Sequence, residues 1–204
     1  MASNRLRRIA KELSDIQADA DSKIMAQAAN GSDLTHLLAS FPGPPDTPYE
    51  GGTYIVDIKI PNEYPFRPPV MFFKTKLWHP NVSSQTVGVP GIPLHFDTDS
   101  LQGAICLDTL GSAWSPVLTI KSALLSLQSL LNSPEPKDPQ DAEVASMLMN
   151  YPEKFQRKAR EWAINHANAP AKTSWSVNTP SGPSQANTKV PRSKEEEMRA
   201  EALR

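Results

Sequence analysis

The apolar residues of this chain change their spacing between its first and second halves, and this change limits the folds that it can adopt. Every second position of residues 53–60 is apolar, which is the pattern of a strand with one buried face. Residues 119–132 instead carry apolar side chains at intervals of three and four, as in an amphipathic helix with Thr119 as its N-cap. The stripe consists of Ile120, Leu124, Leu127 and Leu131. Strands and helices in separate blocks predict an α+β fold rather than a doubly wound sheet.

The remainder of the first half predicts one helix and three more strands. Residues 4–17 form an amphipathic helical pattern with Ser3 as the N-cap. Its apolar positions are Leu6, Ile9, Ala10, Leu13 and Ile16. Apolar stretches at 22–29 and 34–41 flank the turn signal Asn30-Gly31, and another stretch runs from 70 to 75. We therefore expect an N-terminal helix followed by a four-stranded antiparallel meander.

Two further helices are expected after residue 132. Asp138 is followed by proline, which predicts an N-cap and a first helical residue, with Asp141 near the positive end of that helix. Asn150, with a proline just inside, is expected to open the last helix. The apolar side of that helix carries Phe155, Ala159 and Trp162.

The composition changes near residue 168. Residues 169–190 are rich in Pro, Ser, Thr and Asn and contain little that a core would bury. We predict one folded domain over 1–168 and a disordered polar tail over 169–204.

Composition also excludes several classes of function. A net charge of −1, from 21 basic and 22 acidic residues, gives no electrostatic case for nucleic-acid binding. No apolar run approaches the roughly 18–20 residues of a membrane span, and no secretory signal is visible. The single Cys106 rules out an internal disulfide and a thiolate-rich zinc site, and the four histidines lack metal-ligand spacing. No cofactor or metal is therefore expected.

The most specific pattern lies around Cys106. The tripeptide His79-Pro80-Asn81 precedes the run Gly103-Ala104-Ile105-Cys106-Leu107-Asp108, and Trp114-Ser115-Pro116 follows. These segments resemble the ubiquitin-conjugating enzymes, and the resemblance extends from Arg5 to Ala167. Other segments that fit the family are Phe41-Pro42-Gly43-Pro44, Pro48-Tyr49-Glu50-Gly51-Gly52, Tyr64-Pro65-Phe66-Arg67-Pro68-Pro69 and Ser133-Pro134-Glu135-Pro136. The chain looks most like the subgroup that carries a C-terminal ubiquitin-associated domain.

The resemblance implies that Cys106 accepts ubiquitin from the activating enzyme as a thioester. It would then pass the acyl group to a lysine amine or to a ligase cysteine. A thiol suits this work because thioesters react readily with amines and the thiolate forms at modest cost near neutral pH. Taken alone, a single cysteine is more often a small buried apolar residue, and it is the flanking motifs that favour the carrier.

The same resemblance gives three neighbours their expected roles. Asn81 would donate its amide to the oxyanion of the tetrahedral intermediate, or hold the loop that does so. His79, with Pro80, would fix the turn of the tripeptide rather than act as a general base. Asp138 matches the acidic residue beside the acceptor-lysine channel, although the same carboxylate is also a good helix cap.

Partner surfaces are implied as well. Arg7, Arg8 and Lys11 match the helix face used for the activating enzyme. Phe66, Trp114, Pro116 and Val117 match the two loops that grip RING- or HECT-type ligases. The implied partners are ubiquitin, the activating enzyme, which uses the ATP, and a ligase. The implied setting is a monomer of the cytoplasm and nucleus.

The chain departs from the family between Asn81 and Cys106, which are much closer together in the family pattern. Removing residues 87–102 restores that pattern. One hypothesis is a genuine surface loop, since loop closure depends only weakly on length. The other hypothesis is a translated intron, because the segment is in frame, the codon of Val87 must begin with GT and the codon of Gln102 can end in AG. Comparing genomic with messenger sequence decides between them.

Two other readings stay open at this stage. If the insertion disables transfer, the chain would be a non-catalytic binding module of the ubiquitin pathway. His95 and Asp97 within the insertion would suggest a cysteine hydrolase, but their local sequence offers no oxyanion partner. Residues 169–204 also lack the apolar pattern of a ubiquitin-associated domain, so that domain is expected to be missing here.

Overall fold

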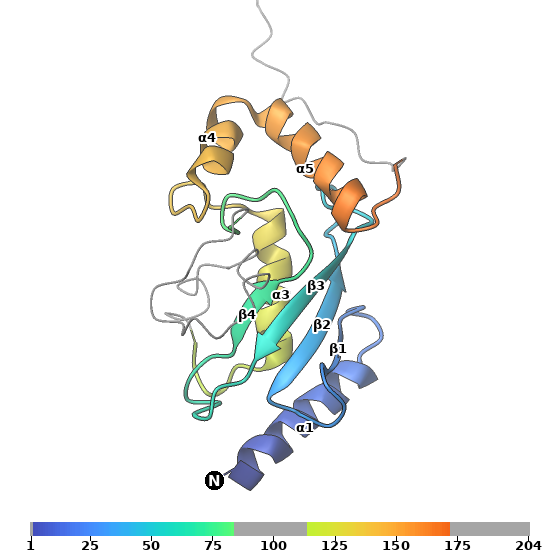
Figure 1. Cartoon of the computed structure of the whole chain (residues 1–204), viewed down its shortest axis with the longest axis vertical. Coiled ribbons are helices and arrows are strands. Elements are labelled where there is room, and N and C mark those ends of the chain that lie inside the picture. The colour runs from blue at the N-terminus through green and yellow to red at the C-terminus, as the bar shows by residue number, and fades with distance from the viewer. Residues whose placement is uncertain (1, 84–113, 172–204) are drawn as a thin grey trace, which may run out of the picture.

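The computed structural model describes residues 2–83 and 114–171 (Figure 1). Helix α1 (Ala2–Ala18) precedes a four-stranded sheet, and helices α3 (Ile120–Asn132), α4 (Ala142–Asn150) and α5 (Pro152–His166) follow it. The predicted α+β architecture is confirmed. In Figure 1, α4 and α5 lie at the end of the sheet opposite the N-terminus. None of the helices in the described part of the chain is long and apolar enough to span a membrane.

The sheet is the predicted antiparallel meander. Strands β1 (Met25–Ala28), β2 (His36–Pro42), β3 (Thr53–Lys59) and β4 (Val70–Phe73) are hydrogen-bonded in that order. The register pairs Val56 with Ala39 on one side and with Phe73 on the other. Burial alternates along β2 and β3, so one face of the sheet is covered. The buried side chains of that face include Leu37, Phe41, Tyr54, Ile58 and Phe73.

Helix α3 supplies the opposing side of the core. The predicted stripe of Ile120, Leu124, Leu127 and Leu131 is buried throughout. The predicted cap is also confirmed, since Thr119 accepts a hydrogen bond from the Ser122 backbone N–H. The Ser122 hydroxyl lies 2.9 Å from the Thr119 backbone nitrogen, which completes a capping box.

Three predicted helix boundaries are wrong. Helix α1 already includes Ala2, so Ser3 lies within its first turn and is not the N-cap. The cap of α4 is Asp141 rather than Asp138, because the Asp141 carboxylate accepts from the N–H groups of Glu143 and Val144. Asn150 closes α4, and α5 begins after Tyr151 with proline in its first turn.

The predicted apolar stripe of α1 is wider than the buried one. Ile9, Leu13 and Ile16 are buried, whereas Leu6 and Ala10 face solvent. The N-terminal end of α1 extends away from the sheet (Figure 1), so Leu6 in its first turns has less to pack against, whereas Ala10 lies on the solvent side of the helix next to the buried Ile9. At the other end of the fold, Ala169 is buried and the Pro170 carbonyl accepts from Arg160. Ordered contacts therefore continue just past the predicted domain boundary at 168.

The connection between β2 and β3 places a tyrosine behind the site described below. The Gly43 N–H donates to the Gly52 carbonyl at 2.9 Å. A Cβ at Gly43 would lie 1.9 Å from the Tyr49 carbonyl oxygen, so this close approach requires glycine. Tyr49 is thereby held in the core, where its hydroxyl donates to the Trp78 carbonyl at 2.7 Å.

Candidate active site

His79 is fully buried and both of its ring nitrogens are occupied. Nδ1 accepts from the Asn81 backbone N–H at 3.1 Å, so Nε2 carries the proton and donates to the Leu130 carbonyl at 3.1 Å. The Tyr49 ring packs on the imidazole with centroids 5.9 Å apart. Burial lowers the pKa of His79 to about 4, against the opposing effect of the hydrogen bond to Leu130. A neutral ring with no free nitrogen joins two backbone segments and is not placed to act as a base.

We expect His79 to make the fold sensitive to acid. The folded chain keeps the ring neutral, whereas the unfolded chain protonates it near the ordinary pKa of about 6.5. Its contribution to stability is therefore complete above pH 6.5 and is lost as the pH falls toward 4. Between pH 7 and pH 4.5 this residue should remove about 2 kcal/mol from the free energy of unfolding.

Urea titrations of the wild-type chain and of His79→Gln at both pH values measure this effect. The stability difference between the two proteins should shrink at pH 4.5, because the variant lacks the titrating ring. An equal difference at both pH values would contradict a buried neutral imidazole.

Asn81 joins the tripeptide to the loop between α3 and α4, residues 133–141. Its side-chain Nδ2 donates to the carbonyls of Glu135 and Asp138 at 2.8 and 2.9 Å. Its Oδ1 accepts from the Glu135 N–H at 2.8 Å. The residue is buried, and both amide protons are used. Of the two expected roles, this geometry is that of a residue that holds a loop.

Pro80 strengthens the same junction. Its carbonyl accepts from the backbone N–H groups of Gln140 and Asp141 at 2.8 and 3.0 Å. These bonds keep residues 138–141 out of the helix, which is the physical reason why α4 begins only at Ala142. We call the contacts of Pro80 and Asn81 with the 133–141 loop the site clip.

Asp138 takes part in the site clip through its backbone only. Its carbonyl accepts from Asn81, while the residue itself is exposed. The structure thus brings Asn81 and Asp138 together and leaves the carboxylate of Asp138 at the solvent-facing edge of the site. The backbone partners Glu135 and Gln140, and Tyr49 behind His79, were missed by the sequence analysis. For Glu135 and Tyr49 the signal was membership of the proline-rich segments that fit the family.

Cys106 lies outside the described residues, as do the insertion 87–102 and its His95 and Asp97. Ser83 and Trp114 are the described residues on either side. Within residues 2–83 and 114–171, no group of three or more His, Cys, Asp or Glu side chains is placed to hold a metal ion.

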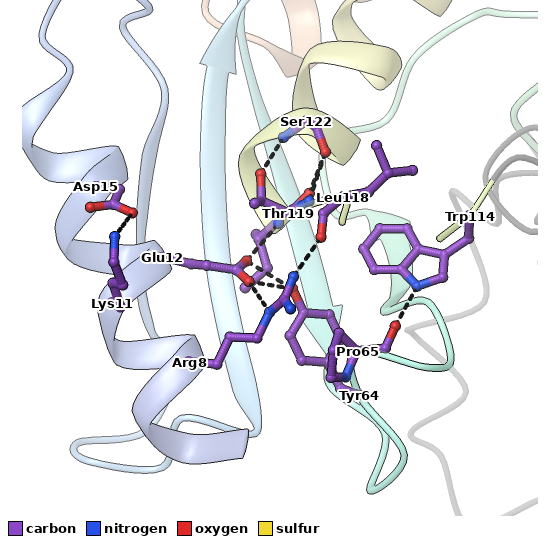
Figure 2. A network of polar contacts seen from close by, with 11 residues as sticks. Arg8, Lys11, Glu12, Asp15, Tyr64, Pro65, Trp114, Leu118, Thr119 and Ser122 are labelled. Carbon is purple, nitrogen blue, oxygen red and sulfur yellow. Dashed lines mark hydrogen bonds and ion pairs between the residues drawn. The ribbon is translucent and has the colours of Figure 1, made fainter. Parts of the chain in front are cut away.

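Two loops near α1 present the predicted apolar contacts. Phe66 and Val117 are 79% and 85% exposed, and Pro116 is also exposed. Trp114 is only half-buried, and its indole N–H donates to the Pro65 carbonyl at 2.8 Å (Figure 2). The two loops, 64–66 and 114–117, are therefore joined directly, and both carry apolar side chains in solvent.

The three basic residues of α1 differ in their surroundings. Arg7 is exposed, and Lys11 forms a surface ion pair with Asp15 at 2.8 Å. Arg8 instead points toward the protein, where its Nε donates to Glu12 at 2.8 Å and its Nη2 to the Leu118 carbonyl at 2.9 Å (Figure 2). Arg8 is thus already engaged within the chain.

Comparison with known proteins gives consistent matches. A family model described as ubiquitin-conjugating enzyme matches residues 8–90 and 91–163. Ubiquitin-conjugating enzyme E2 1 of Schizosaccharomyces pombe is 53% identical over 171 residues, which cover 84% of this chain and 71% of that protein. Ubiquitin-conjugating enzyme E2 27 of Arabidopsis thaliana is 48% identical over 78% of this chain and 75% of that protein.

Solved structures agree with these relatives. The E2 domain of a Toxoplasma gondii ubiquitin conjugating enzyme is 45% identical and superposes with a TM-score of 0.67. The superposition covers 79% of this chain and 97% of that one.

Proposed function

Because the chain belongs to the ubiquitin-conjugating enzyme family, whose members transfer ubiquitin through a thioester, we propose that Cys106 is the thioester carrier. In the first step the Cys106 thiolate attacks the carbonyl of ubiquitin's C-terminal glycine and displaces the thiolate of the activating enzyme. In the second, an amine attacks the same carbonyl, the Cys106 thiolate leaves, and the amine loses a proton. The observation that carries this assignment is the site clip beside the His79-Pro80-Asn81 turn, within a chain that matches the family over most of its length.

We assign the neighbouring residues by their geometry. Asn81 and Pro80 hold the 133–141 loop in place, and His79 stabilises the turn from behind as a neutral ring. The exposed carboxylate of Asp138 would orient the incoming ammonium and help it to lose its proton. In this proposal Asn81 acts by holding the 133–141 loop, since both of its amide protons are already used by the Glu135 and Asp138 carbonyls.

Partner docking is proposed on the surfaces described above. Phe66, Pro116 and Val117 would contact a RING- or HECT-type ligase, with Trp114 supporting them. Arg7 and Lys11 would contact the activating enzyme, whereas Arg8 would mainly stabilise this chain through its bonds to Glu12 and the Leu118 carbonyl. A monomer of the cytoplasm and nucleus remains a prediction that rests on the resemblance. The expected absence of nucleic-acid and membrane partners rests on net charge and on the lack of a long apolar run.

The 87–102 segment is proposed to be additional to the catalytic core. The family model matches the chain in two pieces that meet between residues 90 and 91, inside this segment. A core that matches on both sides of the junction supports a working enzyme, with or without the extra residues.

A charging assay tests the function. The wild-type chain and a variant lacking residues 87–102 are each incubated with activating enzyme, ATP and ubiquitin and run on a non-reducing gel. We expect a band heavier by one ubiquitin that disappears with thiol reductant. The deletion variant should be charged at least as fast as the wild-type chain. No band from either folded protein would refute the function. Charging of the deletion variant alone would show that the insertion disables transfer.

A further inference from the structure

Glu12 is a buried carboxylate with partners from three separate parts of the chain. It lies on α1 and is 6% exposed. Its Oε1 accepts from Arg8 Nε at 2.8 Å, and the Tyr64 hydroxyl lies 2.8 Å from both carboxylate oxygens. Its Oε2 also accepts from the Ile120 backbone N–H at 2.8 Å. Such convergence is what a buried charge requires, because an unpaired one would be strongly destabilising.

The partners of Glu12 adjoin the two loops that carry the exposed apolar side chains (Figure 2). Tyr64 stands two residues before Phe66, and Ile120 stands three residues after Val117. Arg8, which Glu12 holds, donates in turn to the carbonyl of Leu118, next to Val117. Glu12 is therefore hydrogen-bonded within the 64–66 loop and, at Ile120, to the helix that directly follows the 114–117 loop.

The contact with Ile120 also fixes the start of α3. The Thr119 cap satisfies the Ser122 N–H, which leaves the N–H of Ile120, the first residue of α3, for Glu12. A carboxylate at this position is favoured by the positive end of the helix dipole. Residues 115–118 lead directly into that cap, so their position follows from it.

We propose that Glu12 is a positioning residue that sets the spacing between Phe66 and Val117, so that one ligase domain can contact both loops at once. The proposal rests on the proposed function, because it takes the ligase as the partner of these loops. We call the hydrogen-bonded side chains of Arg8, Glu12 and Tyr64 the hub. Glu12 and Tyr64 are buried and Arg8 is partly exposed, so Glu12 acts by holding the loops in place without touching the partner.

Removing the Tyr64 hydroxyl tests the hub with little change in packing. Tyr64→Phe keeps the ring that packs against Trp114, with centroids 6.0 Å apart, and deletes the contacts of the hydroxyl with Glu12 and Arg8. We expect it to weaken binding of a RING domain by about five- to tenfold. This is the effect expected when most of the free energy of one hydrogen bond to a charged group is lost from binding. The probe is a RING domain chosen because it accelerates ubiquitin discharge from the wild-type chain. Ligase-free discharge to lysine, measured after charging is stopped, should be unchanged.

Tyr54→Phe is the matched control. It also removes a buried hydroxyl, one that donates to the Tyr49 carbonyl at 3.3 Å, and should bind the RING domain as the wild type does. Glu12→Gln provides a second route if Tyr64→Phe does not fold, and the double variant should bind no more weakly than the worse single variant.

The proposal fails if both single variants bind the RING domain normally, or if ligase-free discharge falls in parallel with binding. Amide chemical shifts of Phe66 and Val117 separate this failure from that of the proposed function. They should move in Tyr64→Phe and stay in place in Tyr54→Phe even if the wild-type chain forms no thioester.

Discussion

Replacing Cys106 with alanine is expected to abolish ubiquitin transfer. The chain contains no second cysteine, so no other side chain can form a reductant-sensitive thioester. Loss of a covalent nucleophile reduces the rate by about 10³-fold or more, which brings discharge to background. The measurement is the amount of charged protein on a non-reducing gel, with the circular dichroism spectrum of the variant as a check of its fold.

Two companion variants sharpen the result. Cys106→Ser should still accept ubiquitin slowly, as an oxygen ester that survives reductant, because the hydroxyl is a weaker nucleophile than the thiolate. His95→Gln should charge normally, whereas a cysteine hydrolase would lose activity. Reductant-sensitive charging that persists in Cys106→Ala would place the carrier elsewhere and overturn the mechanism.

Asn81→Asp is expected to damage both stability and transfer. The substitution has nearly the same shape, but it places a carboxylate oxygen where Nδ2 now lies within 2.9 Å of the carbonyls of Glu135 and Asp138. Repulsion and the loss of two hydrogen bonds should cost about 2–4 kcal/mol, which lowers the melting temperature by about 4–16 °C for a chain of this size. Displacement of the 133–141 loop by about 1 Å should slow lysine discharge by about 10²-fold.

Asn150→Asp serves as the matched control. Asn150 is exposed, and its amide donates to the Ser146 carbonyl within α4, so the change should alter stability by no more than about 0.5 kcal/mol. Differential scanning calorimetry and single-turnover discharge of both variants give the comparison. If Asn81→Asp loses activity at unchanged melting temperature, Asn81 acts on the oxyanion and not on the loop.

The patterns that the sequence predicted well are short-range. The alternation of residues 53–60 and the stripe from Ile120 to Leu131 each depend on one local period. The apolar side chains of both patterns are buried as expected. Thr119 caps α3 because its hydrogen bond reaches only to Ser122. Asp138 did not cap α4 because its segment is held by Pro80 and Asn81, more than 50 residues away in sequence.

The family, and with it the chemistry, was readable from residues 79–81, Cys106 and the proline-rich segments, because several motifs in the family's order rarely agree by chance. The contacts of Asn81, Arg8 and Glu12 were decided only by the tertiary structure. From the sequence, Asn81 could have faced the oxyanion or a loop. Arg8 could have been a basic side chain on the solvent side of α1, but in the structure it donates to Glu12 and to the Leu118 carbonyl. The partners of these side chains include backbone groups of distant segments, and any residue type offers the same backbone N–H and carbonyl, so only the folded arrangement determines which of them a side chain meets.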